Sequence, residues 1–457
     1  MPINILNYIT EFTLWVFLFG STFSNSLSEI TIGIIIGVFI LKKILCKKYF
    51  PLSSPINLML YILCGIVFIT FLRSAYFSES VRGFVRIVKF TFLYFALIDF
   101  FQSDAKRLKR TFWVLMIVAC VTFLNGIFQS IYGFDLLRHK EFIKDDCLRR
   151  IQASFVHPND FGAYIILILP LTLCFFSSSI KRGQRAFLIM NCILGAYCLF
   201  KTSSRGAWLG FIVGIVIYFF FYKRKVTIAV PLAMILLVML LPHGFDRLKS
   251  LFALEQNTVW ERTQLWKGTW NMVKAHPFFG FGINTFSRYF PQYKPSVYWG
   301  IMYSHNSYLQ MWSEIGIFGL LAFLSIIFAV LRITLRDMRK KMQKGLEGLI
   351  LLGLTAGYIA FLIQSGLDTN LFSLKLITLF WVMTAYLVSL NKYLEEEKVE
   401  ECHARETCPR ENGERASINN IPLDSRFRGN DNDQNRTEIQ LHDKELFDLR
   451  SHIIKKL

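Results

Sequence analysis

The sequence predicts an all-α membrane protein that crosses the bilayer about twelve times. Hydrophobic residues make up 53% of the 457-residue chain and aromatic residues 16%. The apolar runs are far longer than a soluble core requires, and many are close to the ~20 residues that a helix needs to cross a ~30 Å hydrocarbon core. Lysine and arginine gather in short segments after every second run. This alternation is typical of a chain that passes back and forth through a membrane.

The predicted spans follow one another along residues 1–390. The first is the least regular, because Ser21, Ser24 and Ser26 interrupt it. No basic stretch followed by a small-residue cleavage site precedes it, so we expect no cleaved signal peptide. The spans are placed near residues 12–28, 29–46, 56–73, 84–101, 112–131, 161–179, 186–201, 207–222, 226–242, 306–331, 346–367 and 371–390.

Basic residues orient the predicted bundle. Short loops rich in Lys and Arg favour the cytoplasmic side, so both termini are expected in the cytoplasm. The formal net charge of +19 is then mainly a signal of topology. A nucleic-acid groove would need these charges on one folded face, and we therefore expect no nucleic-acid partner. The basic clusters lie at Lys42–Lys48, Lys106–Arg110, Lys181–Arg185, Lys223–Lys225 and Arg332–Lys344.

This orientation places three segments of special interest on the outer face, which is the periplasm for a bacterial inner membrane. They are the loop 132–160, the short turn 202–206 and the long segment 243–304 between the ninth and tenth spans. From about residue 391 the chain becomes polar and poor in aromatic residues, which favours disorder. We therefore predict a membrane-embedded domain, 1–390, and a disordered cytoplasmic tail, 391–457.

An imidazole stands where the long outer segment meets the tenth span. His305 and Asn306 precede this span, and Glu314 lies within it. Ionisable groups at membrane depth are costly, so they mark candidate functional sites. A helix dipole disfavours a charged ring at the N-terminus, which suits His305 to accept a proton. The alternative is a histidine that only hydrogen-bonds near a helix start.

Glu314 is too far from His305 for a direct hydrogen bond. If both residues are helical, about 13 Å separates them along the axis. Asn306 and Glu314 could each orient the imidazole or an acceptor, but a structural role is favoured for Glu314.

Two arginines lie in the other outer segments. Arg205 follows Ser204 in the turn between two spans, and its planar, permanently charged guanidinium suits a phosphate-sized anion. The alternative is an arginine that reaches lipid headgroups. Arg262, Trp266 and Trp270 share one face of a predicted amphipathic helix. A turn-rich stretch follows at 276–286, and the aromatic residues after it suit either sugar rings or an interfacial belt.

The outer segments contain no tight set of carboxylates and histidines at metal-ligand spacing. Asp145 and Asp146 stand beside Lys144 and Arg149, which favours a solvated charged loop. We therefore expect neither a metal nor another cofactor.

Four motifs in this order resemble the O-antigen ligase and polymerase superfamily, and the resemblance covers about residues 1–390. They are Ala153–Gly162, Thr202–Trp208, Arg262 through Gly282, and His305-Asn306 with Glu314, Gly316 and Gly319. The resemblance implies a metal-independent, inverting glycosyltransferase of the GT-C type. Its donor would be a glycan on undecaprenyl diphosphate at the periplasmic face. By matching position, Arg205 and Arg262 would bind the diphosphate, and His305 would be the base that activates the acceptor hydroxyl.

Several functions remain open within this resemblance. An O-antigen ligase would transfer a whole glycan to lipid A-core, a polymerase would extend a second carrier-linked glycan, and a protein O-oligosaccharyltransferase would use Ser or Thr. The single large outer loop that ends in His305-Asn306 favours the ligase. A transporter is the non-enzyme alternative, but transporters commonly show repeated halves, which this sequence lacks. The expected partners are the lipid-linked donor, the lipid A-core acceptor and membrane lipids.

Overall fold

The computed structural model describes residues 2–47, 55–139, 141, 150–230, 232–233, 256–296 and 303–407. Helices account for nearly all of the elements within these residues, and an isolated β-bridge joins Phe134 to Glu141. The predicted class, an all-α polytopic membrane protein, is therefore confirmed.

The helices follow the predicted spans closely. Eight of those described are long and apolar enough to cross a membrane, namely α1, α5, α6 with η1, α7, α8, α13, α15 and α16, and α3 is a shorter apolar helix. The bounds are α1 Pro2–Phe23, α2 Asn25–Cys46, α3 Pro55–Leu72, α4 Phe77–Gln102, α5 Lys106–Tyr132, α6 Pro158–Thr172, η1 Leu173–Phe176, α7 Arg182–Thr202, α8 Arg205–Tyr222, η2 Arg224–Val226, α11 Gln256–Ala275, α12 Phe286–Tyr293, α13 Ser307–Leu335, α14 Met338–Met342, α15 Leu346–Ser365, η3 Asn370–Phe372 and α16 Leu374–Thr407.

The structure corrects the limits of the first span, which was predicted at 12–28. Helix α1 begins near the N-terminus and ends at Phe23, and α2 starts two residues later. Ser21 lies inside α1 because its hydroxyl donates to the carbonyl oxygen of Leu18, 2.9 Å away. Ser24 instead separates the two helices, since its side chain accepts the N–H of Leu27 and caps α2. Serine thus serves both within a helix and at its start.

The predicted boundary between domain and tail, at residue 390, falls inside a helix. Helix α16 continues to Thr407, and Leu394 is buried and accepts a hydrogen bond of 2.8 Å from Lys344 Nζ. The helical part therefore extends further than composition indicated. Most of the ninth predicted span, 226–242, and the tail beyond Thr407 lie outside the described residues.

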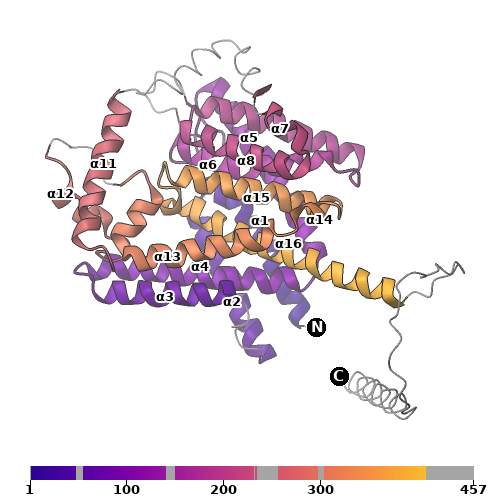
Figure 1. The fold of residues 1–457 in the computed structure, drawn as a ribbon, viewed down its shortest axis with the longest axis horizontal. Coiled ribbons are helices and arrows are strands. Elements are labelled where there is room, and N and C mark those ends of the chain that lie inside the picture. The colour runs from indigo at the N-terminus through magenta and orange to yellow at the C-terminus, as the bar shows by residue number, and fades with distance from the viewer. Residues whose placement is uncertain are drawn as a thin grey trace, which may run out of the picture. The chain divides into compact units, whose positions relative to one another are not determined.

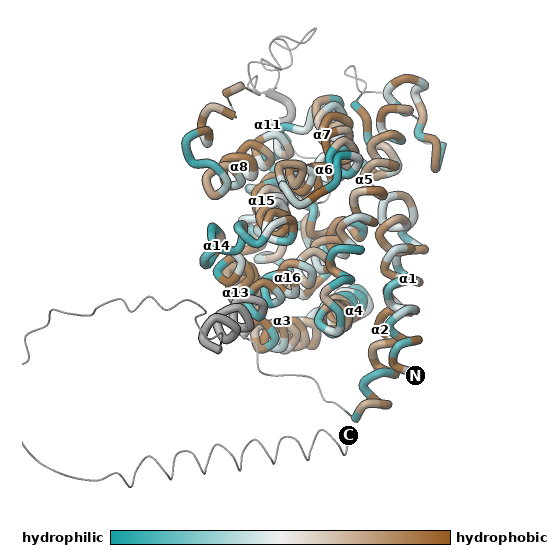
Figure 2. The backbone as a smooth tube through the Cα atoms, turned by 90° about the vertical axis from the view of Figure 1, so that its right-hand side faces the viewer, coloured by the Kyte–Doolittle hydropathy of each residue, from teal (hydrophilic) through white to brown (hydrophobic). Residues whose placement is uncertain are grey.

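Several charged residues in α2 and α4 are held in ion pairs. Asp99 of α4 accepts from Lys42 at 2.6 Å and from Lys43 at 2.7 Å, and Lys89 lies 2.7 Å from Glu29. Such pairing is expected where charges lie within an apolar bundle. Figure 2 shows that most of the labelled helices are largely hydrophobic, whereas the short α14 between α13 and α15 is hydrophilic.

Helix α15 is the central helix that positions the site. It packs against α8 on one face and α6 on another, and glycines allow both approaches. A Cβ on Gly210 of α8 would lie 2.5 Å from the carbonyl oxygen of Ala360, and one on Gly357 would lie 2.1 Å from that of Leu167. Small residues at such contacts let helix backbones approach closely in membranes. In Figure 1, α11 runs across the end of the bundle at which α13 begins.

Candidate functional site

His305 pairs with an aspartate that the sequence analysis did not single out. Its Nδ1 lies 3.0 Å from Oδ1 of Asp368, which belongs to the short link between α15 and η3. The two side chains are 19% and 12% exposed, so the pair is within reach of a substrate. Because Nδ1 faces the carboxylate, Nε2 is the nitrogen that can accept a proton.

The local backbone fixes the imidazole in this position. Asn306 caps α13, since its side chain accepts the N–H groups of Tyr308 and Leu309. His305, just before the cap, has φ of 49°, a left-handed conformation that few residues other than glycine adopt. Strained backbone of this kind gathers at functional sites, where the surroundings hold it in place.

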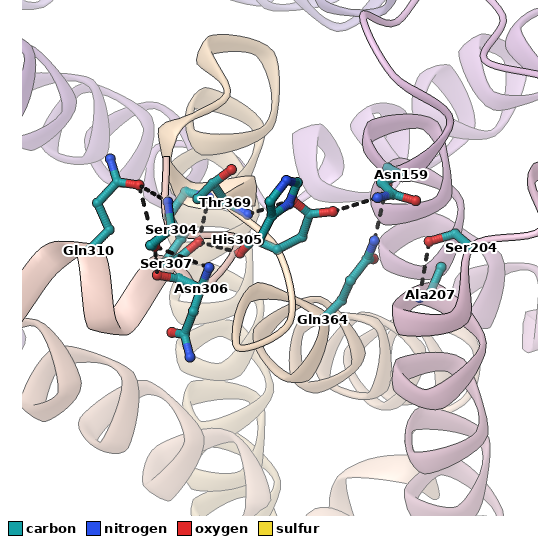
Figure 3. A network of polar contacts seen from close by, with 12 residues as sticks. Asn159, Ser204, Ala207, Ser304, His305, Asn306, Ser307, Gln310, Gln364 and Thr369 are labelled. Carbon is teal, nitrogen blue, oxygen red and sulfur yellow. Dashed lines mark hydrogen bonds and ion pairs between the residues drawn. The ribbon is translucent and has the colours of Figure 1, made fainter. Parts of the chain in front are cut away.

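Asp368 is the partner of several residues in the polar network around His305 (Figure 3). Its Oδ1 also accepts the N–H of Thr369 at 2.8 Å, and its Oδ2 accepts from Asn159 Nδ2 at 2.7 Å. Its carbonyl oxygen accepts both the N–H and the hydroxyl of Ser307 at the start of α13. The figure shows His305 between Asn159 and Ser204 on one side and Gln310 on the other. The network therefore joins three helices around one carboxylate.

The environment keeps the Asp368 carboxyl ionised. Burial would raise its pKa, but the hydrogen bond from His305 and the nearby charges of His305 and Arg262 bring the pKa below its ordinary value. The N–H of Thr369 acts in the same direction. A carboxylate at this position holds the Nδ1–H of the imidazole and favours the charged ring that forms when Nε2 takes a proton.

A further set of polar contacts supports Asn159. Gln364 of α15 donates to its carbonyl oxygen at 3.0 Å, and Arg150 Nη2 donates to its Oδ1 at 2.9 Å. The same guanidinium donates through Nε to the carbonyl oxygen of Thr202 at 2.7 Å. These contacts join the start of α6 to the end of α7 and the end of α15, and so hold Asn159 in place beside Asp368.

Arg205 and Arg262 reach this region from two other helices. Arg205 is the first residue of α8, and the neighbouring Gly206 packs against Gln364 and Leu367 beside Asp368. Arg262 lies on α11, close enough to Asp368 to act on its carboxyl electrostatically. Both arginines are half-buried. The starts of α6, α8 and α13 also meet here, and a helix N-terminus favours anions.

Ser204 and Glu314 both make hydrogen bonds that stabilise the fold. The hydroxyl of Ser204, which precedes Arg205 in the turn, accepts the N–H of Ala207 at 3.5 Å and caps α8. Glu314 is 2% exposed, and its carboxylate accepts the N–H groups of Asn284 at 2.7 Å and Phe286 at 3.3 Å. These contacts agree with the predicted structural role of Glu314, since they hold the stretch between α11 and α12.

This stretch fills a break in α13. Gly316 has φ of 70° and ψ of −179°, which interrupts the helix, and the N–H of Ile317 donates to the carbonyl oxygen of Pro277 at 2.9 Å. A Cβ on Gly316 would lie 2.0 Å from the carbonyl oxygen of Phe278, so only glycine fits. The backbone groups released by the break thus find partners in the turn-rich segment.

The aromatic residues of the outer segment divide into two groups. Tyr289, Tyr293 and Tyr303 pack against a small core of Leu265, Met272, Phe281, Phe286 and Phe290. Of these three, Tyr303 also lies against the imidazole of His305, with 4.8 Å between ring centroids. Most of the aromatic stretch therefore builds the outer core, while Tyr303 is placed to contact a substrate at His305.

The described residues contain no group of three or more His, Cys, Asp or Glu side chains that could hold a metal ion. Asp145 and Asp146, which were interpreted as a solvated charged loop, lie outside these residues.

Sequence reasoning missed Asp368, Gln364 and Arg150. Asp368 could have been predicted from its position. The predicted orientation places the short link between the last two spans on the outer face, beside the other candidate residues. A polar residue in a short link between two apolar helices is as strong a candidate for the site as one in the long loop. Asn159 was named only as part of a motif, since its partner is distant in the sequence.

Comparison with known proteins confirms the predicted resemblance. Residues 190–324 match a family model described as O-antigen ligase, a segment that includes Arg205, Arg262 and His305 and ends before Asp368. The chain is also 21% identical over 330 residues to the teichuronic acid biosynthesis protein TuaE of Bacillus subtilis (strain 168). That alignment covers 66% of this chain and 64% of the relative. The matches support a membrane glycosyltransferase activity of the O-antigen ligase or polymerase type.

Proposed function

We propose that this protein is an O-antigen ligase, which transfers a glycan from undecaprenyl diphosphate to a sugar hydroxyl of lipid A-core. The observation that carries the proposal is the His305–Asp368 pair, whose imidazole is partly exposed, near the starts of three helices. The basic loops favour an orientation with both termini in the cytoplasm, so the reaction takes place at the periplasmic face of the inner membrane.

The proposed reaction is a single displacement. His305 Nε2 accepts the proton of the acceptor hydroxyl, and the hydroxyl oxygen forms a bond to the anomeric carbon of the donor. The bond from that carbon to the diphosphate oxygen breaks, and its electron pair leaves with the diphosphate. Attack from the opposite face inverts the anomeric configuration. Asp368 stabilises the imidazolium that forms during the step.

Cationic groups assist departure of the diphosphate. A diphosphate spreads its charge over several oxygens, so it requires charge stabilisation more than a proton donor. Arg205 and Arg262 supply two permanent charges, and the positive ends of the helix dipoles add to them. This arrangement provides the charge stabilisation that Mg²⁺ provides in other phosphate chemistry. The protein is accordingly a metal-independent GT-C-type transferase in this proposal.

The choice of lipid A-core as acceptor rests on the long outer segment that leads to His305. The name of the relative assigns it to teichuronic acid biosynthesis, which is a different product. That comparison supports a lipid-linked glycan as substrate and leaves the acceptor to experiment.

Deletion of the gene, followed by a lipopolysaccharide gel, tests the acceptor. A ligase defect leaves bare core together with free lipid-linked polymer. Core that carries a single repeat unit would identify the protein as a polymerase instead.

The chemistry is tested with the purified protein and a lipid-linked donor. We expect full activity in excess chelator and a product of inverted configuration. Loss of activity that Mg²⁺ restores would contradict the proposed role of the arginines, and a product of retained configuration would contradict the single displacement.

A further inference from the structure

The length of α13 sets the depth of the outer segment in the membrane. Arg332, near the inner end of α13, is exposed and belongs to the basic cluster that is expected to face the cytoplasm. Phe318 precedes Arg332 by about 21 Å of helix, so a hydrocarbon core of about 30 Å extends about 9 Å outward beyond Phe318. Trp312 then lies near the outer edge of that core, where tryptophan is enriched.

The turn that follows α11 packs on α13 below this edge. The ring of Phe278 stacks on that of Phe318, with 6.0 Å between the ring centroids. The carbonyl oxygen of Pro277 accepts the N–H of Ile317 at 2.9 Å, which fixes the turn beside the break in α13. A part of the predicted outer segment therefore reaches the depth of the hydrocarbon core.

The rings at this contact face outward from the protein. Phe278 is 59% exposed and Phe318 is 44% exposed, although both are large apolar residues. Exposed apolar residues continue along α13 at Leu321, Leu324 and Phe328. Their spacing of three or four residues places them with Phe318 on one face of the helix. Contiguous exposed apolar residues of this kind mark an interaction surface, and on a membrane-spanning helix they face lipid.

Helix α11 carries the polar part of the same surface. Trp270 is 45% exposed and meets the ring of Trp312 edge to face, with 5.5 Å between the centroids. The exposed Lys267 and Lys274 lie three and four residues from Trp270, so all three share one face of α11. Figure 1 shows α11 running across the end of the bundle at which α13 begins. Tryptophan and lysine on such a helix are typical of the headgroup region, where long cationic side chains reach lipid phosphates.

We propose that this surface, formed by Lys267, Trp270, Lys274, Phe278 and Phe318, is seated in the outer leaflet of the membrane. Its occupant is phospholipid, with acyl chains against the two phenylalanines and headgroup phosphates along α11. Two observations favour lipid over a protein partner. The surface continues the exposed apolar face of α13, and it changes from basic to apolar at the depth of Trp312. The turn after α11 is thus a membrane anchor and not an aqueous loop.

The anchor has a consequence for the reaction. Helix α11 also carries Arg262, which is close enough to Asp368 to act on its carboxyl electrostatically. An anchored α11 holds this arginine near the level of the headgroups, which is also the level of the diphosphate of a lipid-linked donor. This consequence rests on the proposed function, whereas the seating of the surface in lipid does not.

Cysteine labelling of the full-length protein tests the anchor. Phe278→Cys and Ser287→Cys are compared in phospholipid nanodiscs that hold one copy of the protein. Ser287 is exposed on α12, in the same outer segment, and is the matched control. A membrane-impermeant maleimide is added, and mass spectrometry of the labelled peptides separates each site from the natural cysteines. A thiol in apolar surroundings stays protonated and unreactive, so we expect Phe278→Cys to react at least about tenfold more slowly than Ser287→Cys.

Equal labelling rates in nanodiscs overturn the proposal. Protection of Phe278→Cys that appears only in proteoliposomes with many copies assigns the surface to a second copy of the chain. Protection that appears only after addition of lipid-linked donor assigns it to the isoprenoid chain; either result also overturns the proposal. Photocrosslinking is the second measurement. Benzoylphenylalanine at position 278 should crosslink phospholipid, and at position 287 it should not. Crosslinks to this chain alone at position 278 would mean that protein covers the site.

Glycan transfer by Phe278→Asp tests the consequence for Arg262. A carboxylate at this depth is costly, so the turn should move outward and raise KM for the donor about tenfold. Ser287→Asp should behave as the wild type. An unchanged donor KM in Phe278→Asp contradicts the link to Arg262.

The two kinds of measurement fail separately. If the wild type transfers no glycan but Phe278→Cys is protected as expected, the anchor stands and the proposed reaction fails. If transfer proceeds and both cysteines react equally fast, the reaction stands and the anchor fails.

Discussion

Asp368 and Glu314 are two buried carboxylates, 8% and 2% exposed, that are held in different ways. Asp368 accepts from the imidazole of His305, from the amide of Asn159 and from the N–H of Thr369. Glu314 accepts from two backbone N–H groups and from the Gln310 amide, 3.4 Å away. The first carboxylate thus binds a group that can gain a proton, and the second binds groups that cannot.

This difference suits Asp368 to a role in the reaction and Glu314 to a role in the fold. A carboxylate that orients a partly exposed imidazole controls which nitrogen accepts a proton and stabilises the charged ring. A carboxylate that accepts backbone N–H groups fixes the path of the chain, and here it secures the stretch that fills the break in α13. Variants at the two positions should therefore change different measurements.

Removal of the base should have the largest effect. His305→Ala is expected to lower the rate of glycan transfer about 10²–10⁴-fold, the contribution of a positioned general base. The rate is measured with a lipid-linked donor in proteoliposomes. His305→Gln is the matched variant, because its amide can still donate to Asp368 but is not basic. A rate near that of the wild type in either variant would remove His305 from the proposed chemistry.

Asp368→Asn should follow, with kcat about a hundredfold lower and KM nearly unchanged. The amide keeps the size of the side chain but favours the wrong tautomer of His305 and no longer stabilises its charged form. Steady-state kinetics with varied donor and acceptor measure both constants. An effect confined to KM would place Asp368 in substrate binding.

The difference in stability between the wild type and this variant should also depend on pH. The pKa of Asp368 is held below the ordinary value of 3.8, so its carboxylate stabilises the folded state fully above that pH. The stabilisation is lost as the pH falls through the lower folded-state pKa. Thermal unfolding of the wild type and Asp368→Asn should therefore converge on acidification. A gap that widens toward low pH would mean that the carboxyl is not held ionised.

Asn159→Ala should have a smaller effect, about a tenfold lower kcat, because it lets Asp368 and His305 shift without removing either. Arg150 loses its acceptor, the Oδ1 of Asn159, whereas the backbone carbonyl that accepts from Gln364 remains. The bell-shaped dependence of kcat on pH should move as well, which a purely structural loss would not cause. An unchanged pH profile would limit Asn159 to a structural role.

The sequence was sufficient to predict the helical class and most of the helices, because long apolar runs have few alternatives in a membrane. The wrong predictions concern polar residues that form part of a helix. Ser21 resembled an interruption but bonds within α1, and the polar residues after Leu390 continue α16. Propensity alone does not decide such ends, since tertiary contacts such as Lys344 with Leu394 stabilise them.

The site was predicted in part, and the missing part was the set of long-range partners. His305 and the two arginines became candidates because ionisable groups stood out at the predicted outer face. The pairing of His305 with Asp368 depends on how α13 and α15 pack against each other. The hydrophobic periodicity of a single helix does not predict this packing. The structural role favoured for Glu314 rested on its distance from His305 along the helix. This distance follows from the sequence separation alone.

Glu314→Gln should have the smallest effect on chemistry and a clear effect on stability. The amide keeps one acceptor oxygen but weakens the bonds to Asn284 and Phe286, so we expect a loss of about 1–3 kcal/mol in the free energy of unfolding. The kcat of the folded protein should change little, because Glu314 contacts no reacting group. Gly316→Ala is the matched variant, since its Cβ would meet the Phe278 carbonyl at 2.0 Å and disturb the same stretch. Both variants should lower the unfolding temperature and leave the pH profile of kcat unchanged. If Glu314→Gln instead lost kcat as Asp368→Asn does, at unchanged stability, the two carboxylates would share one function.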